Sequence, residues 1–502
     1  MRRVEFALVG STSTHWSAGL GRVRTASVGE GLVAVSCDYS FPYWPGRAHY
    51  DGHALRHRVV VYDEASRAIR HVFDDLRFPV HEMAWRPDGG ALALACGEYD
   101  GGWFYEGELV IWEFEPNRAR RPMRDCRYVT RVRWADARTV VVLARPPNDE
   151  FGEPDDLYAG TFADAGAIEA QPCDPRSAGF DGPQAVVDRS WFDRDPPSPP
   201  DRVWDVAFTR GGARLITCGD RGVAAYTSEL HPLGTSLPDV PCVQLLTHGG
   251  EVLVHALAGP KGQPISELHR LVADGTQLLR GFDRVYLFSI DLDGRLLARD
   301  TTRELSRRAD RILDPHGRDA WVGVIGHFDC FNHSLRVDHA PALLFLRGSP
   351  PTSYQAKTLC RAMDDGTVDP LFRWDEPPSH RMEPCATAVR GDELVAGYRL
   401  YDPHPGKGER WIERRSHGSG RVSWRVEWPF APVALAAVPA VDAVLVATLD
   451  GRLAALDHRT GELLATIQLA AGTAVEPMCL AAEGHRIAVG ANDGRVLLLE
   501  LR

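Results

Sequence analysis

Residues 487–499 read Ile-Ala-Val-Gly-Ala-Asn-Asp-Gly-Arg-Val-Leu-Leu-Leu, two short apolar runs joined by an Asn-Asp-Gly turn. Residues 444–457 repeat the pattern as Val-Leu-Val-Ala-Thr-Leu-Asp-Gly-Arg-Leu-Ala-Ala-Leu-Asp. Short apolar runs bounded by Gly and Asp are typical of buried β-strands, and such turns are typical of antiparallel hairpins. The two stretches therefore predict one structural unit that recurs along the chain.

The same unit can be followed through most of the sequence, and helical periodicity is almost absent. Repeated sets of four short strands predict the blades of a β-propeller. We expect an all-β chain with a single domain, residues 1–502, that is one closed β-propeller of four-stranded antiparallel blades. The expected number of blades is eight or nine, with ten as the upper limit. The blades are expected near residues 21–74, 80–122, 127–173, 202–238, 242–281, 283–374 with an insertion, 384–428, 432–469, and 476–500 together with 3–9.

The last unit offers three strands, whereas the other units offer four. Residues 3–9 form an apolar run that belongs to none of the other units. We expect residues 3–9 to pair beside residues 495–499, because a donated strand would complete the last blade and remove an exposed sheet edge.

Two short motifs resemble known propeller repeats. The turn Pro87-Asp88-Gly89, with Ile111-Trp112-Glu113 at the end of the third strand, resembles a WD40 repeat. Residues 455–461, Ala-Leu-Asp-His-Arg-Thr-Gly, resemble the A-x-D-x-x-T-G stretch of quinoprotein-like propellers. A true Trp-Asp pair, Trp204-Asp205, begins a strand instead of ending one. The resemblance implies a propeller fold over nearly the whole chain and implies no particular activity.

Composition limits the classes of partner and the location. A net charge of −11 disfavours nucleic acid, because neutralisation of phosphates supplies most of the sequence-independent affinity. The ten cysteines are scattered singly, which favours a reducing cytoplasm. The first ten residues resemble neither a signal peptide nor a membrane span, so no membrane contact is expected. Lysine occurs only at Lys261, Lys357 and Lys407, and this arginine bias indicates a bacterial source.

Sequence motifs of the common hydrolases and nucleotide-binding enzymes are missing from the chain, including the nucleophile elbow, the H-E-x-x-H motif and the P-loop. We therefore name no catalytic residue and expect a non-catalytic scaffold that binds a protein partner through one rim of the propeller. Two alternatives stay open. A hydrolase or lyase site could be assembled inside the channel from separate blades, or the propeller could bind a glycan or another small ligand.

One cluster has the composition of a metal site. His327, Cys330, His333 and His339 lie at short spacing, and two or more imidazoles with a thiolate can converge on zinc. The alternative is that these residues are polar loop positions and a buried thiol, because the spacing matches no standard structural zinc motif. No other cofactor is expected.

Aromatic residues are concentrated in long loops between the second and third strands of certain units. These loops lie on one rim of a propeller, and aromatic anchors dominate many protein interfaces. The alternative is that the rings pack on one another as a lid over the channel mouth. The predicted partner-binding residues are Phe41, Tyr43, Trp44, Trp103, Phe104, Tyr105, Tyr401 and Trp411.

Overall fold

The apolar runs of the sequence form strands in a computed structural model of the chain, and many of them are buried along their whole length. In β34 (Ala443–Thr448) all residues are buried, because the strand is the second of four in its sheet and neighbouring sheets cover both faces. The outermost strand of the same sheet, β36 (Leu463–Gln468), alternates between exposed and half-buried positions. The structure describes residues 4–12, 22–39, 56–99, 105–123, 128–145, 158–163, 169–172, 202–258, 265–283, 285–300, 308–326, 328, 333, 335–348, 357–374, 381–401, 410–448, 450–471 and 473–502.

Within these ranges the chain forms nine four-stranded antiparallel sheets, one three-stranded sheet and a two-stranded ribbon. The expectation of an all-β chain built from repeated four-stranded units is therefore confirmed. The helices of the described ranges are short 3-10 turns such as η1 (Arg210–Gly212) and η3 (Pro439–Val441), and none of them has the length and apolar character to cross a membrane. Each sheet is named below after its lowest-numbered strand. The one exception is the sheet of β39, β40, β41 and β1, which is called the β39 sheet because β1 is its fourth strand.

Contacts divide the described residues into two compact units. The larger unit contains residues 4–12 and 202–502, and the smaller unit contains residues 22–39 and 56–172. A single ring of eight or nine blades is not confirmed, because ten sheets of three or four strands are present in the described ranges, and they are shared between two units. The count differs from nine because the region 283–374, expected to hold one blade and an insertion, forms two sheets.

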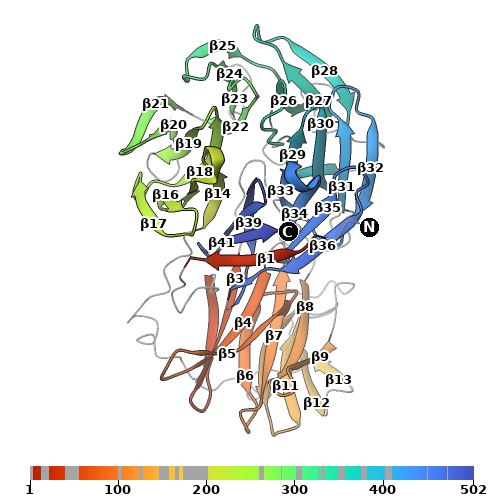
Figure 1. Cartoon of the computed structure of the whole chain (residues 1–502). Helices are drawn as coiled ribbons and strands as arrows, with labels where there is room; N and C mark the ends of the chain where they lie inside the picture. The colour runs from red at the N-terminus through yellow and green to blue at the C-terminus, as the bar shows by residue number, and fades with distance from the viewer. Residues whose placement is uncertain are drawn as a thin grey trace. The chain divides into compact units, whose positions relative to one another are not determined.

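The larger unit holds seven of these sheets (Figure 1). Its strands are β14 (Val203–Phe208), β15 (Arg214–Gly219), β16 (Gly222–Thr227), β17 (Pro232–Ser236), β18 (Cys242–His248), β19 (Glu251–Ala258), β20 (Ile265–Val272), β21 (Gly275–Phe282), β22 (Val285–Ile290), β23 (Leu296–Asp300), β24 (Asp310–Leu313), β25 (Asp319–Gly323), β26 (Leu343–Arg347), β27 (Thr358–Ala362), β28 (Val368–Arg373), β29 (Arg381–Arg390), β30 (Glu393–Tyr401), β31 (Arg410–Ser416), β32 (Val422–Glu427), β33 (Pro432–Val438), β34, β35 (Arg452–Asp457), β36, the ribbon β37 (Ala470–Ala471) and β38 (Thr473–Ala474), β39 (Pro477–Glu483), β40 (Arg486–Ala491), β41 (Val496–Leu501) and β1 (Phe6–Ser11).

The first strands of these sheets lie beside one another. β14 contacts β39 on one side and β18 on the other, and contacts continue from β18 to β22 and from β22 to β26. β33 likewise lies between β29 and β39, while the β26 and β29 sheets share one apolar core that includes Leu344, Leu359 and Leu394. The approach of the β39 sheet to the β14 sheet is close, since a Cβ on Gly490 would lie 2.4 Å from a methyl group of Val203. Glycine at this position therefore permits the contact between the two sheets.

The smaller unit holds three sheets, which pack in chain order (Figure 1). Trp112 is fully buried between the first two of them and stacks against Phe73 with ring centroids 5.3 Å apart. The strands are β2 (Arg22–Val28), β3 (Leu32–Tyr39), β4 (Arg56–Asp63), β5 (Ile69–Leu76), β6 (Val80–Trp85), β7 (Ala91–Tyr99), β8 (Tyr105–Glu113), β9 (Arg118–Met123), β10 (Val129–Trp134), β11 (Thr139–Ala144), β12 (Tyr158–Ala163) and β13 (Glu169–Pro172).

The N-terminal strand completes the last sheet, as the sequence predicted. β1 pairs antiparallel with β41, with Phe6 opposite Leu501 and Ser11 opposite Leu497 (Figure 1). Backbone hydrogen bonds extend the pairing on both sides of the strand, from Glu5 to Arg502 and from Thr12 to Val496. The first and last described segments of the chain are thus held in one sheet.

A bulge recurs in the first strand of all nine four-stranded sheets of the described ranges, after the first pair in seven of them, after the second pair in β2 and after the fourth pair in β29. In β14, Val203 pairs with Gly219, and Asp205 pairs with the adjacent residue of β15, Cys218. Trp204 is therefore an additional residue in this strand. The same shift occurs in the first strands of the other sheets. Because bulges increase local twist and redirect side chains, this repeat fixes which residue of each first strand follows the bend.

The residue after the bulge links neighbouring sheets in three places. Asp205 accepts a hydrogen bond from the backbone N–H of Leu245, at 3.0 Å, and the Gln244 side chain accepts one from Phe288, also at 3.0 Å. In the smaller unit Glu82 accepts the N–H of Val132 at 2.7 Å. In each pair, the donor is the residue that follows the equivalent position in the first strand of the next sheet. The same hydrogen-bonding arrangement therefore occurs within the larger unit and within the smaller unit.

A buried histidine in the β18 sheet gives a pH-dependent test of this packing. His255 accepts a hydrogen bond from Ser266 at Nε2, at 2.6 Å, and donates from Nδ1 to Gln244 at 3.1 Å. Burial, reinforced by the charge of Arg336, lowers the pKa of His255 to about 3. Since the unfolded imidazole titrates near 6.5, protonation favours the unfolded state at any pH below that value.

We therefore expect the free energy of unfolding to fall by about 1.4 kcal/mol for each pH unit between pH 6 and pH 4 through this group. His255→Gln removes the titration and should show a slope smaller by about this amount in urea denaturation measured across the same range. Parallel slopes for the two proteins would contradict the assignment of a neutral buried imidazole.

Candidate functional site

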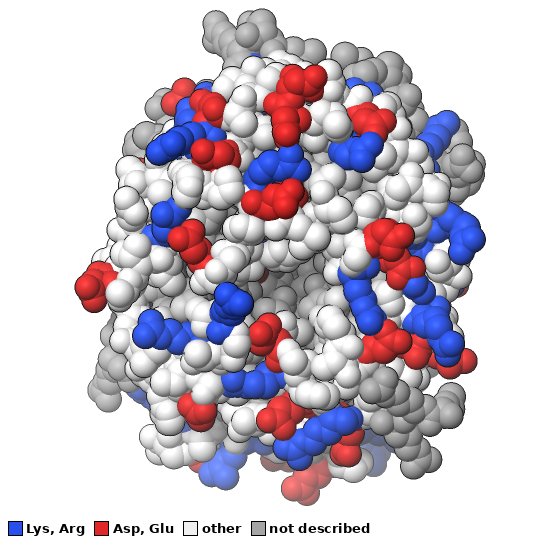
Figure 2. Space-filling model, turned by 45° about the horizontal axis from the view of Figure 1, so that its top comes forward, with Lys and Arg blue, Asp and Glu red and all other residues white. Residues whose placement is uncertain are grey.

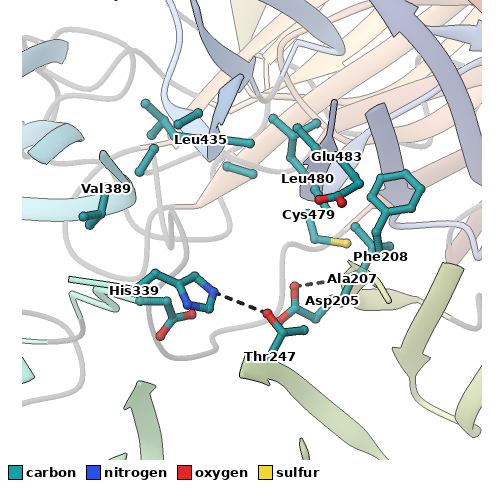
Figure 3. A pocket seen from close by; sticks show the side chains of 18 of the residues that line it. Asp205, Ala207, Phe208, Thr247, His339, Val389, Leu435, Cys479, Leu480 and Glu483 are labelled. Atoms are coloured by element: carbon teal, nitrogen blue, oxygen red, sulfur yellow. Dashed lines mark hydrogen bonds between the residues drawn. The ribbon is translucent and has the colours of Figure 1, made fainter. Parts of the chain in front are cut away.

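A cavity of about 630 Å³ lies among the first strands of the larger unit (Figure 3). Five sheets contribute to it, together with an irregular segment between the β22 and β26 sheets. The residues that carry the argument below are Asp205, Thr247, Arg336, Asp338, His339, Thr387, Leu435, Cys479 and Glu483.

One wall of the cavity consists of small side chains. The first strands β29, β33 and β39 contribute Ala388, Ala434, Ala436, Ala437, Ala481 and Ala482 to the lining. Larger apolar side chains, among them Val389, Leu435 and Leu480, stand between them. Because alanine fills little of the space in front of a strand, this side of the unit leaves room for another molecule.

The opposite wall is an ionic cluster centred on Arg336. Its guanidinium lies 2.5 Å from Asp205 through Nη1 and 2.5 Å from Asp338 through Nε, and Nη2 donates to the carbonyl of Leu245 at 2.6 Å. Asp338 also accepts the N–H of Ile290 at 3.1 Å. Each charged group thus has both an ionic partner and a backbone partner.

The electrostatics of the cluster follow from this arrangement. Burial lowers the pKa of the Arg336 guanidinium, but the charges of Asp205 and Asp338 raise it by more, and the net pKa is above the ordinary value for arginine. Removing one member would leave a buried charge without compensation, which costs far more than the intact cluster contributes. The cluster therefore ties the segment that carries Arg336 to β14 and β18 and keeps a fixed charge pattern on the wall.

His339 is the most exposed polar group of this wall. Its backbone is left-handed, with φ of 60°, a conformation that is uncommon for residues other than glycine. The strain is offset locally, since its N–H donates to the carbonyl of Ile290 at 2.7 Å and its Nε2 lies 3.3 Å from the Thr247 hydroxyl. The bend presents the imidazole to the cavity (Figure 3).

Turns between first and second strands border the cavity in two of its sheets. Pro439, Ala440 and Gly484 line the cavity, and all three belong to turns between first and second strands. The loops of residues 40–55, 100–104 and 402–409 join second to third strands, as the sequence predicted. Successive turns of an antiparallel sheet alternate between its two ends, so connections of these two kinds leave opposite ends of a given sheet.

Most of the predicted partner-binding residues are not placed. Phe41, Tyr43, Trp44, Trp103 and Phe104 lie outside the described residues. Tyr105 and Tyr401 are placed as strand residues, in β8 and β30, at the edges of two of these loops. Their role, and that of the five unplaced residues, stays a prediction.

Trp411 is the one predicted aromatic anchor with a described side chain. It lies half-buried on β31 and packs against the apolar core shared by the β26 and β29 sheets. The guanidinium of Arg425 lies over its ring, 5.6 Å from the centroid. Part of this ring therefore serves the fold, and the exposed part is what a partner could contact.

The predicted zinc ligands are placed only in part. His327 and Cys330 lie outside the described residues, whereas His333 is buried and His339 lies in the cavity wall. Across the described ranges no three His, Cys, Asp or Glu side chains are grouped as metal ligands. Zinc binding by this cluster stays a prediction.

The sequence did not indicate Arg336, Thr247 or Glu483 as site residues. One available signal was the Trp204-Asp205 pair, which stood out because it begins a strand. In the structure Trp204 donates from its indole to Asp220 at 2.7 Å, and Asp205 joins the cluster at Arg336, 131 residues further along the chain. Two residues so far apart in the chain leave no local sequence pattern from which their contact could be predicted.

Basic and acidic side chains are intermixed on the face of the molecule seen in Figure 2, around a hollow. Neither sign forms a continuous patch over this face. Since nucleic-acid binding depends on extended positive surfaces, this face lacks the feature that such binding would require.

No family model matches the sequence, and no curated protein matches it. Among solved structures, the WD40 domain of Pan2 from Neurospora crassa is similar, with a TM-score of 0.44 and 11% identity over 61% of this chain and 90% of that chain. Virginiamycin B lyase from Staphylococcus aureus is also similar, with a TM-score of 0.42 and 13% identity over 60% of this chain and 96% of that chain. Neither likeness bears on activity. The chain has a propeller-like β fold, as its own sheets show.

Proposed function

We propose that this chain is a non-catalytic scaffold that binds a protein partner, and that the seven sheets of its larger unit form a closed ring. The neighbour contacts of the first strands support the ring, because they lead from the β14 sheet through its neighbours and back to the β39 sheet. A closed ring has no free sheet edges between its blades, so its rims and its channel are the surfaces left for binding.

The observation that carries the proposal is the packing of the β2 sheet against the β6 sheet, which share one apolar core. Trp44 lies in the sequence between β3 and β4, and Trp103 lies between β7 and β8, which are the second and third strands of these two neighbouring sheets. Because equivalent connections leave the same end of neighbouring sheets, we expect Trp44 and Trp103 to belong to adjacent loops. Paired aromatic anchors of this kind supply much of the free energy of protein association, at roughly 2 kcal/mol or more each.

The test is affinity purification of the tagged full chain from its own host, followed by mass spectrometry. We expect one stoichiometric partner with the unaltered protein and its loss from Trp44→Ala with Trp103→Ala, at an unchanged melting temperature. Leu463→Ala is the control, since Leu463 is also an exposed apolar side chain, 51% accessible, but lies on β36. Recovery of no partner by the unaltered protein, or full recovery by the double variant, would refute the proposal.

A second candidate is a binding protein for a small ligand or a glycan, and the cavity favours it. Small apolar residues on one side and the polar groups of His339 and Thr247 on the other are a common combination in ligand sites, and Glu483 adds a carboxylate at the end of β39. Native mass spectrometry of protein from the host would show a bound ligand as added mass. Ala436→Phe fills the cavity and would remove that mass, while leaving partner recovery through the aromatic loops intact.

A further inference from the structure

The β26 sheet has three strands, whereas the six other large sheets of the larger unit have four within the described residues. Its first ladder strand, β26, is buried at four of its five positions, which is typical of the second strands of the other sheets. Its last strand, β28, is partly exposed like the outermost strands elsewhere. Within the described residues, the innermost position of the β26 sheet is therefore not filled by a strand that pairs with β26.

Residues 335–340 lie in that innermost position. They precede β26 in the chain, as a first strand would, and they run parallel to β22 through the bridge between Asp291 and Ala340. The neighbouring first strands of a propeller also run parallel to one another. The sequence Leu-Arg-Val-Asp-His-Ala alternates as a strand does, with Leu335 and Val337 buried in the core beside Leu344.

The hydrogen bonds of this segment go to other sheets. Besides the bridge, the Val337 N–H lies 3.5 Å from the Ser289 hydroxyl, and the His339 N–H donates to Ile290. On the other side the Thr387 hydroxyl donates to the carbonyl of Arg336. The segment is therefore held between the β22 and β29 sheets and has strand-like burial with no ladder to β26.

Arg336 makes the farthest contacts of the segment. Its guanidinium reaches Asp205 on β14 and the carbonyl of Leu245 on β18, two sheets that do not adjoin the segment's own position. One side chain thus ties the segment to the far side of the inner strands and forms a wall of the cavity.

We propose that residues 335–340, called the strap below, are a displaced first strand that closes one wall of the cavity, and that the contacts of Arg336 with Asp205 and Leu245 control its opening. When the guanidinium leaves Asp205, the strap loses its contacts to β14 and β18 and retains those to β22 and β29. The strap then opens locally while the sheets stay folded. This inference goes beyond the proposed function, because it concerns the cavity wall and requires no partner.

Hydrogen exchange of the full chain, resolved by peptide, tests the strap in the variant Arg336→Met, which keeps the apolar stem and removes the charge. We expect exchange of residues 335–340 to accelerate by roughly tenfold or more, with the buried strands β34 and β40 changed by far less. Arg361→Met is the matched control, since Arg361 pairs with Asp369 on the outer side of the same β26 sheet.

Equal acceleration over the strap and over β34 and β40 would overturn the proposal, because Arg336 would then stabilise the whole unit and no local opening would exist. Unchanged exchange of the strap would overturn it as well. If Arg336→Met does not fold, Thr387→Val removes only the hydroxyl that donates to the strap. That variant is expected to accelerate exchange of residues 335–340 by about threefold, and the same two outcomes would count against the strap.

Discussion

Removal of residues 1–11 is expected to destabilise the larger unit severely. The deletion removes β1 and with it five cross-strand pairs to β41, together with the buried ring of Phe6. If each pair contributes about 1 kcal/mol, the free energy of unfolding falls by on the order of 5 kcal/mol. The backbone of β41 also becomes a free edge, and free edges promote association between chains. A lowered melting temperature and oligomers in size-exclusion chromatography are the expected measurements.

Leu8→Ser provides the control for this deletion. Leu8 is 46% accessible and pairs with Leu499 through its backbone, so the substitution removes apolar surface without removing the strand. Its stability should remain close to that of the unaltered chain. A truncated protein that melts at the original temperature as a monomer would show that β1 contributes nothing to the stability of the β39 sheet.

Asp205→Ala is expected to cost roughly 3–5 kcal/mol of unfolding free energy, which is typical when one partner of a buried ion pair is removed. Asp205 accepts the N–H groups of Val206 and Leu245, both at 3.0 Å, and pairs with Arg336. The substitution leaves two backbone donors and part of a guanidinium without acceptors. Denaturation in urea, with the slope checked for two-state behaviour, measures the loss.

Two further variants separate the charge of Asp205 from its hydrogen bonds. Asp205→Asn keeps a carbonyl oxygen that can still accept from Leu245, so it should cost less than Asp205→Ala. Asp205→Ala combined with Arg336→Met should cost less than the sum of the two single changes, because the second change removes the charge that the first one leaves unpaired. Strict additivity would mean that the two side chains do not depend on each other.

The regular parts of the fold could be predicted from the sequence, because they depend on local patterns. Residues 444–457 and 487–499 form adjacent strands of two sheets, as their apolar runs and Asp-Gly turns indicated. The pairing of β1 with β41 could also be predicted. The apolar N-terminal run belonged to no other unit, and the last unit had only three strands of its own. The division into two units could not, because it depends on which sheet faces pack together, and every sheet has similar apolar faces.

The cavity escaped prediction for a different physical reason. Its polar wall combines Asp205 and Thr387, which come from two sheets, with Arg336, which comes from the irregular segment before β26, and the three have no common spacing. The strap was hidden as well, since residues 335–340 have a strand-like alternation but follow the candidate metal residue His333 and contain another, His339. The repeat pattern of the sequence therefore predicted an insertion in this region.

The bulge in the first strand of each four-stranded sheet also acts as a phase shift in the alternation of side chains. Val203 and Asp205 flank the additional residue Trp204 and pair with consecutive residues of β15, so they face opposite surfaces, whereas residues two apart in an unbroken strand face the same surface. Cys242 and Gln244 flank Val243 in the same way. In an unbroken strand of the same sequence, Asp205 and Gln244 would face the surface that Val203 and Cys242 face, away from the next sheet. The contacts between sheets therefore depend on the count of residues in a strand as well as on their chemistry.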